Sequence, residues 1–137
     1  MMKNELTVDA VTENLPRVQS FVDEHLEMAG CPMKTQIQIG VVVEEIFVNI
    51  AHYAYVPDTG RATVCVELSE EPARVTIVFL DSGIPYNPLA RPDPDVTLPA
   101  AERPIGGLGI YITKKTMDSV SYEYRDGKNI LTLRKNL

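Results

Sequence analysis

Hydrophobic and polar positions alternate along this chain with two periods, one typical of helices and one typical of strands. The longest apolar run covers residues 39–55, and its apolar positions recur on one side of a helix: Ile39, Val43, Phe47, Ile50 and Ala54. The β-branched residues at 41–43 would also suit a strand. Because strands rarely run beyond about ten residues, the length of the run favours a helix.

The other side of this predicted helix carries a line of polar residues. Glu45, Asn49 and His52 follow one another at i, i+4 and i+7, and Lys34 and Gln38 continue the line. One interpretation is the solvated face of an ordinary amphipathic helix. The alternative is a narrow furrow, because the line is flanked by three valines, Val41, Val42 and Val48. A carboxylate in a furrow needs a partner, for example a metal, a polar ligand or water.

The rest of the pattern predicts one more long helix, one short helix and several strands. Residues 5–8 predict an edge strand. A long helix is predicted next, with Asn14 as its candidate N-terminal cap, Pro16 in its first turn and Gly30 at its end. The apolar stripe of that helix is Leu15, Val18, Val22, Leu26 and Ala29. Residues 61–69 and 75–80 predict a hairpin, 110–117 a helix, and 120–124 with 130–134 a second hairpin around Asp126-Gly127.

Composition limits the possible functions. The chain has 137 residues, 45% of them hydrophobic, which predicts a single globular domain over residues 1–137. A net charge of −6, with no basic cluster larger than Lys114-Lys115, argues against a nucleic-acid partner. The charged residues within 39–55 argue against a membrane span. Cys31 and Cys65 lack metal-ligand spacing, and no apolar leader is evident, so we expect a reduced, cytoplasmic protein.

Two loops have compositions that suit ligand binding. Asp81 follows an alternating strand, where its carboxylate can accept a hydrogen bond from a base, and Gly83 would allow a ligand close to the backbone; the alternative is a plain Asp-x-Gly turn. Gly106, Gly107 and Gly109 precede or open a helix, which suits phosphate, although a flexible loop is the alternative. Between the two lie about sixteen residues without periodicity, a length typical of lids.

The three motifs together resemble one family. Glu45-x-x-x-Asn49, the string at 81–88 (Asp-Ser-Gly-Ile-Pro-Tyr-Asn-Pro) and Gly106-Gly-Leu-Gly109 are similar, in this order, to the N, G1 and G2 boxes of the GHKL ATPases. Within that superfamily, the anti-sigma-factor serine kinases are most similar. The resemblance covers nearly the whole chain. It implies an α+β two-layer sandwich, the Bergerat fold, with a mixed and mostly antiparallel sheet, helices on one face and a lid over ATP.

The resemblance also implies roles for individual residues. Asn49 would ligate Mg²⁺, Asp81 would accept from the adenine amino group, and Glu45 would be the general base. Glu44 points about a quarter turn away from Asn49 and is the poorer candidate. Further residues are implied for nucleotide binding. Gly83 would make room for the adenine ring, and Thr132 would contact adenine. Gly106, Gly107, Leu108 and Gly109 would bind the phosphates, and Arg103 would lie at the γ-phosphate, with a solvated arginine as the alternative.

The function implied is an ATP- and Mg²⁺-dependent serine/threonine kinase. Its substrate would be an anti-sigma-factor antagonist of the STAS type, and it would also be able to sequester a sigma factor and to form a homodimer. The alternative is a non-catalytic module that selects protein partners by whether ATP or ADP is bound. A fragment of a sensor histidine kinase is a weaker alternative, because no helical hairpin with a phospho-acceptor histidine precedes the predicted domain.

Overall fold

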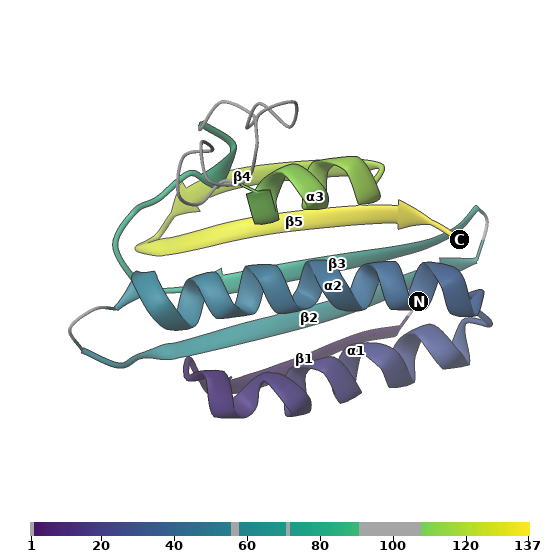
Figure 1. Cartoon of the computed structure of the whole chain (residues 1–137), viewed down its shortest axis with the longest axis horizontal. Coiled ribbons are helices and arrows are strands. Elements are labelled where there is room, and N and C mark those ends of the chain that lie inside the picture. Colours follow the sequence, from purple (N-terminus) through teal and green to yellow (C-terminus); the bar gives the residue numbers. More distant parts are fainter. Residues whose placement is uncertain (1, 56–57, 71, 91–107) are drawn as a thin grey trace, which may run out of the picture.

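The computed structural model describes residues 2–55, 58–70, 72–90 and 108–137 (Figure 1). In this part of the chain, one antiparallel sheet with the strand order β1-β2-β3-β5-β4 is covered by helices on one face. The elements are β1 (Met2–Asp9), α1 (Leu15–Met28), α2 (Met33–Asn49), β2 (Arg61–Glu70), β3 (Ala73–Asp81), α3 (Leu108–Thr116), β4 (Ser119–Arg125) and β5 (Lys128–Asn136). The predicted two-layer α+β fold is confirmed, and all four strand pairings are antiparallel.

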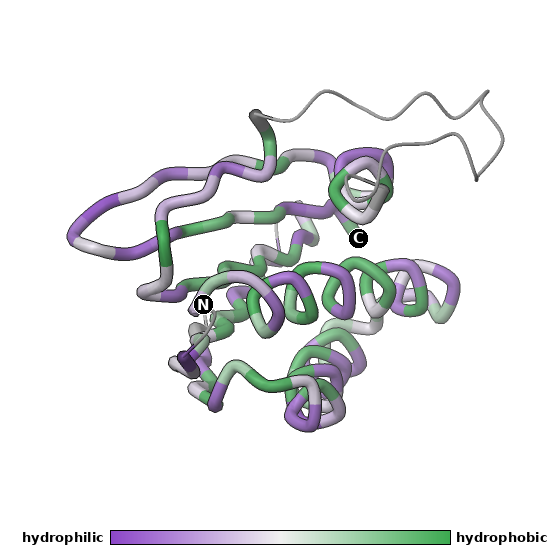
Figure 2. The backbone as a smooth tube through the Cα atoms, turned by 60° about the vertical axis from the view of Figure 1, so that its left-hand side comes forward, coloured by the Kyte–Doolittle hydropathy of each residue, from purple (hydrophilic) through white to green (hydrophobic). Residues whose placement is uncertain are grey.

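The sheet has one covered and one open face, as the alternation along its strands predicts. Val75, Ile77 and Phe79 of β3 are almost completely buried beneath the helices, whereas the residues between them lie on the open face. Figure 2 shows how hydrophobic and polar positions succeed one another along the strands. The predicted terminal strand is confirmed as β1, which lies at the edge and pairs with β2.

α2 is the central helix of the covering layer and runs between α1 and α3 (Figure 1). The predicted helix over residues 39–55 is confirmed, with an earlier start at Met33 and a π-helical turn, Ile50–Ala54, at its end. Ile39, Val43 and Phe47 of the predicted stripe are fully buried. Burying a side chain of this size contributes about 1.5–3 kcal/mol, so this side of α2 is a main source of stability.

The first helix begins and ends where the sequence predicts, but two details of the prediction are wrong. Asn14 occupies the cap position, yet its side chain makes no capping bond; its Nδ2 donates to the Asp9 carbonyl at 2.9 Å. Ala29 lies on the exposed side. His25 is buried instead, because its Nδ1 donates to the Phe21 carbonyl and its Nε2 accepts from Asn4 Nδ2, so that both ring nitrogens have partners.

By length and composition alone, the continuous helix Met33–Ala54 could cross a membrane, and it is the one such helix among the described residues. In the fold, its most apolar side lies against the sheet and the adjacent helices, while Glu44 and Asn49 are exposed on the other side. This arrangement is typical of the core helix of a globular domain.

Two glycines provide a test of backbone conformation in this fold. Gly40 lies inside α2, and a methyl group added there would meet nothing within 4 Å, so Gly40→Ala should stabilise the protein by about 1 kcal/mol through helix propensity. Gly127 also has open space but lies at φ +77° in the β4–β5 turn. Gly127→Ala should therefore destabilise by about 1 kcal/mol or more. Urea unfolding measures both, and a lower midpoint for Gly40→Ala would contradict the assignment.

Candidate functional site

Four segments that are distant in sequence form the candidate site. The end of β3 at Asp81 and the start of β5 lie at the end of the molecule where α2 ends, and α3 starts beside the C-terminal half of α2 (Figure 1). Close approaches join them: a methyl group added at Gly83 would collide with the Ala54 carbonyl, and one added at Gly109 would collide with the Glu45 carboxylate. The structure thus brings residues from all three sequence motifs into one region.

Asp81 is buried and has a fixed orientation. Its side chain is 8% exposed, and its Oδ1 accepts hydrogen bonds from the Gly83 backbone N and from Asn129 Nδ2, both at 2.9 Å. In the described part of the chain, Oδ2 makes no hydrogen bond, and no fully buried side-chain oxygen or nitrogen lacks a partner. Oδ2 is therefore not completely buried and, among the described residues, has no partner, so it can accept a hydrogen bond.

Asn129 is a site residue that the sequence interpretation missed. It is 7% exposed, and its Nδ2 donates both to Asp81 and to the Ile84 carbonyl at 2.9 Å. Its Oδ1 accepts from the Tyr86 backbone N at 3.1 Å and from the Tyr122 hydroxyl at 2.5 Å. All four hydrogen-bonding positions of the amide are used, so Asn129 positions Asp81 and has no capacity left for a ligand.

One signal could have identified Asn129. In the sequence it stands two residues before Leu131 and four before Leu133, so it shares the face of the strand on which both leucines are buried. The structure then places it opposite Asp81. A polar residue at a core-facing strand position needs hydrogen-bond partners. Asn129, a polar residue at the start of the alternating pattern of β5, therefore indicated a buried hydrogen-bond network.

The π-helical turn after α2, together with Tyr55, contacts the loop that follows Asp81 from the helix layer. The Tyr55 hydroxyl accepts from the Ser82 backbone N at 2.7 Å and donates to the Arg61 carbonyl at 2.5 Å. The backbone N of Ile84 donates to the Ala54 carbonyl at 3.0 Å. Gly83 was predicted to leave room for a ligand ring; in the structure its missing side chain allows this contact with the π-helical turn.

Glu45 and Asn49 lie one helical turn apart on the side of α2 that faces away from the core. Glu45 is half-buried and Asn49 is exposed. Because Gly109 has no side chain, the Glu45 carboxylate can lie against the first turn of α3, near the positive end of that helix dipole. Among the described residues, Glu45 makes no hydrogen bond or ion pair. Glu44 is exposed.

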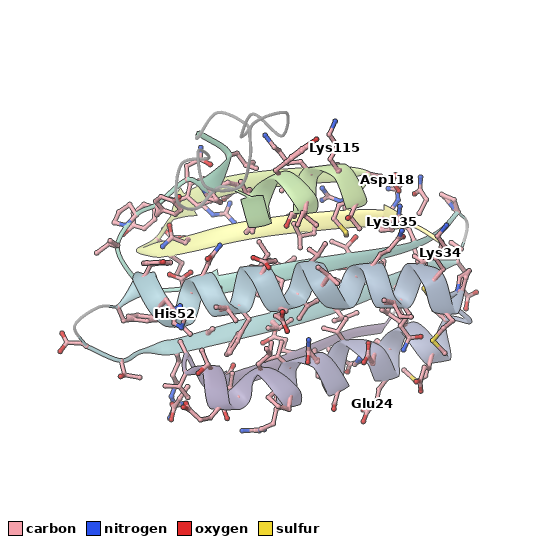
Figure 3. All side chains as sticks on the ribbon, in the orientation of Figure 1. Glu24, Lys34, His52, Lys115, Asp118 and Lys135 are labelled. Carbon is pink, nitrogen blue, oxygen red and sulfur yellow. The ribbon has the colours of Figure 1, made fainter. Side chains whose placement is uncertain are left out.

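The structure does not bring every predicted residue to this region. Thr132 lies between the buried Leu131 and Leu133 and pairs with Val78, so it belongs to the open face of the sheet, opposite Asp81. Leu108 is the first residue of α3. Arg103, Gly106, Gly107 and the predicted lid lie outside the described residues, and His52 is exposed near the end of α2 (Figure 3).

The described residues contain no cluster of three or more histidine, cysteine or acidic side chains that could hold a metal ion alone. A magnesium ion often has only one or two protein ligands, with phosphate oxygens and waters completing its shell. The exposed amide oxygen of Asn49 fits that mode of binding, since it is an oxygen donor beside the Glu45 carboxylate.

Comparisons with known proteins show which proteins this chain is similar to. The chain is 28% identical over 95 residues to the serine-protein kinase RsbW of Bacillus mycoides, and 27% identical over 116 residues to RsbW of Bacillus cereus strain AH187. These alignments cover 66% and 77% of the chain. The chain spans 58% of the length of the first relative and 71% of the second.

Solved structures have the same fold. The RsbU and RsbW domains of Rv1364c from Mycobacterium tuberculosis match all of this chain and 33% of theirs, with a TM-score of 0.70 and 16% identity. The SiaB–SiaC complex of Pseudomonas aeruginosa contains a chain that matches 96% of this one over 89% of its own length, with a TM-score of 0.59 and 16% identity. The family model described as histidine kinase-like ATPase domain matches residues 8–135. The chain therefore belongs to the histidine kinase-like ATPase domain family, and it is related to the RsbW serine-protein kinases.

Proposed function

We propose that this protein binds ATP with Mg²⁺ at the end of α2 and transfers the γ-phosphoryl group to a serine of a protein partner. The observation that carries the proposal is the convergence of Asp81, Asn49 and Glu45 with the first turn of α3, where the Glu45 carboxylate has no hydrogen-bond or ion-pair partner among the described residues. The name serine-protein kinase, which the relatives carry, supports the same reaction. The partner would be an anti-sigma-factor antagonist.

The adenine base would be recognised by Asp81. Its Oδ1 is already used by Gly83 and Asn129, which leaves Oδ2 to accept from the exocyclic amine of adenine. A base that presents a carbonyl oxygen at the same position would place an acceptor against an acceptor. The network therefore favours adenine over guanine.

Phosphoryl transfer needs in-line placement and charge neutralisation more than covalent chemistry by the protein. When bound, Mg²⁺ neutralises charge on the phosphates, and Asn49 would hold it. Glu45 would take the proton from the serine hydroxyl at its carboxylate. The first turn of α3 lies against Glu45, and its backbone N–H groups would suit phosphate oxygens.

A second candidate is a module that binds nucleotide and selects partners without transfer. The hydrogen bonds around Asp81 favour this candidate. Asn129, Gly83 and Tyr55 fix Asp81 and the loop after it, and Glu45 takes no part in these contacts. The two candidates differ in one respect only, whether Glu45 acts on a bound serine.

Replacing Glu45 separates the two candidates. Glu45→Ala should lower the rate of label transfer from ATP to an antagonist domain by about 100-fold or more, since general bases contribute on this scale. Mg-ATP affinity by calorimetry should stay within about twofold of wild type, because Glu45 is not part of the Asp81 network. Glu44→Ala, an exposed acid one position earlier, is the matched control. Equal transfer by Glu45→Ala and wild type would remove Glu45 as the base.

The role of the Asp81 hydrogen-bond network in ATP binding can be tested at Asn129. Asn129→Ala should weaken ATP binding by about tenfold, because Asp81 loses a donor and its orientation. Thr132→Ala changes the same strand on the opposite face and should leave affinity unchanged. Calorimetry below the unfolding temperature measures both. If Thr132→Ala weakens binding and Asn129→Ala does not, adenine lies elsewhere.

The metal role of Asn49 predicts a magnesium-specific effect. Wild type should bind ATP more tightly with Mg²⁺ than with EDTA, and Asn49→Ala should lose most of that difference while its magnesium-free affinity stays the same. Isothermal calorimetry in the two buffers gives the ratio. A variant that retains the full magnesium gain would show that another group holds the ion.

A further inference from the structure

A groove lies between the edge strand β1 and helix α1, away from the candidate site. It has a volume of about 730 Å³ and lies at the opposite edge of the sheet from β4 (Figure 1). Two of its lining residues, Asn4 and His25, already have partners, because Asn4 Nδ2 donates to His25 Nε2 at 2.8 Å. Phe21 and Met28 line it with apolar surface, and Met28 is 64% exposed. We call this surface the β1 groove.

The backbone of β1 has hydrogen-bonding groups that point out of the sheet. The Ala10 backbone N donates to the directly opposite Gly60 carbonyl at 2.8 Å, and hydrogen-bonded pairs alternate along antiparallel strands. The even-numbered residues of β1 therefore bond to β2, whereas the N–H and C=O groups of Glu5 and Thr7 point outward. Among the described residues, β1 pairs with β2 alone, so these outward groups have no strand beside them.

The C-terminal end of β1 supports this assignment. Asp9 is also odd-numbered, and its carbonyl accepts from the Val11 backbone N at 2.8 Å and from Asn14 Nδ2 at 2.9 Å, so it points away from β2. These two contacts close the edge at Asp9 and leave it open at Glu5 and Thr7. An open edge strand beside a helix is a site where an extended peptide can add as a further strand.

The charges that line the β1 groove have one sign. Its acidic lining residues are Glu5, Glu24 and Glu27, and no lysine or arginine is found among its described lining residues. Figure 3 shows Glu24 projecting from α1 on the side away from α2. Arg17, the one lysine or arginine of α1, lies about two turns before Glu24. Three carboxylates at one groove favour a partner with basic side chains.

We propose that the β1 groove binds an extended segment of a protein partner in which apolar and basic residues alternate. The backbone of this segment would pair with the outward groups of β1, its apolar side chains would contact Phe21 and Met28, and its basic side chains would face the three glutamates. A second copy of the chain paired through β1 would bring two sets of these glutamates to one interface, where like charges repel. The inference goes beyond the proposed function, because it involves no residue of the candidate site.

The first test measures binding of a fluorescent peptide, Lys-Val-Lys-Leu-Lys-Val-Lys, to the full chain by anisotropy at low salt. The Kd should be below about 1 mM, and a peptide with glutamate in place of lysine should not bind. Glu24→Gln/Glu27→Gln should raise the Kd by about fivefold or more, and added salt should reduce this difference. Glu44→Gln/Glu123→Gln changes the net charge equally at exposed acids of α2 and β4 and should bind as wild type. Absence of binding, or equal losses in the two double variants, would overturn the proposal.

The second test addresses the backbone of β1. Thr7→Pro removes an outward N–H, which an edge strand tolerates, and should raise the Kd by about tenfold. Thr7→Val is the matched control: both variants lose the 2.9 Å hydrogen bond between the Thr7 and Thr63 hydroxyls, but valine keeps the N–H. Circular dichroism checks that both variants fold. Equal affinities of the two folded variants would contradict strand pairing.

Methylated peptides test the same pairing without changing the protein. Two versions of the peptide carry methyl groups on alternate backbone nitrogens, one version for each edge of the added strand. One version should lose binding and the other should keep it, because only one edge faces β1. Equal affinities of the two versions would overturn the proposal. Sedimentation that finds a dimer in wild type and a monomer in Thr7→Pro would assign the β1 edge to a second copy and would also overturn it.

Discussion

The packing of α2 against the centre of the sheet is the constraint on which the rest of the structure depends. Phe47, Val43 and Ile39 are fully buried, and α2 lies between α1 and α3 (Figure 1). A helix buried this deeply cannot rotate about its axis without exposing apolar surface. The burial of one side therefore determines the direction of Glu45 and Asn49 on the other, and it orients the candidate site before any ligand arrives.

The second constraint is the double attachment of Asp81. From the sheet, Asn129 donates to it and is itself held by the Tyr122 hydroxyl; from the helix layer, Tyr55 and Ala54 hold the loop that follows. Gly83 and Gly109 are the positions where these layers approach most closely. A carboxylate whose orientation is fixed from both sides can distinguish hydrogen-bond donors from acceptors on a ligand.

The same helix carries three different surfaces. Its buried side stabilises the fold, its C-terminal part carries the candidate chemistry, and its N-terminal half exposes Met33, Ile37 and Val41. Because an α-helix is rigid over this length, contacts at one end have a defined position relative to groups at the other. A single element can thus link the stability of the fold to the position of the candidate chemistry.

The sequence by itself determined the elements and the family. The periodicity predicted α1, α2, both hairpins and the edge strand, because the burial of one side of each element imposes a 3.6- or two-residue period. The motif order pointed to the family through Glu45, Asn49 and Asp81. Only the tertiary structure revealed that Asn129 positions Asp81, that Thr132 lies on the opposite face, and that Met33, Ile37 and Val41 stay exposed. These facts depend on strand register and on which neighbours cover a residue, and local pattern contains neither.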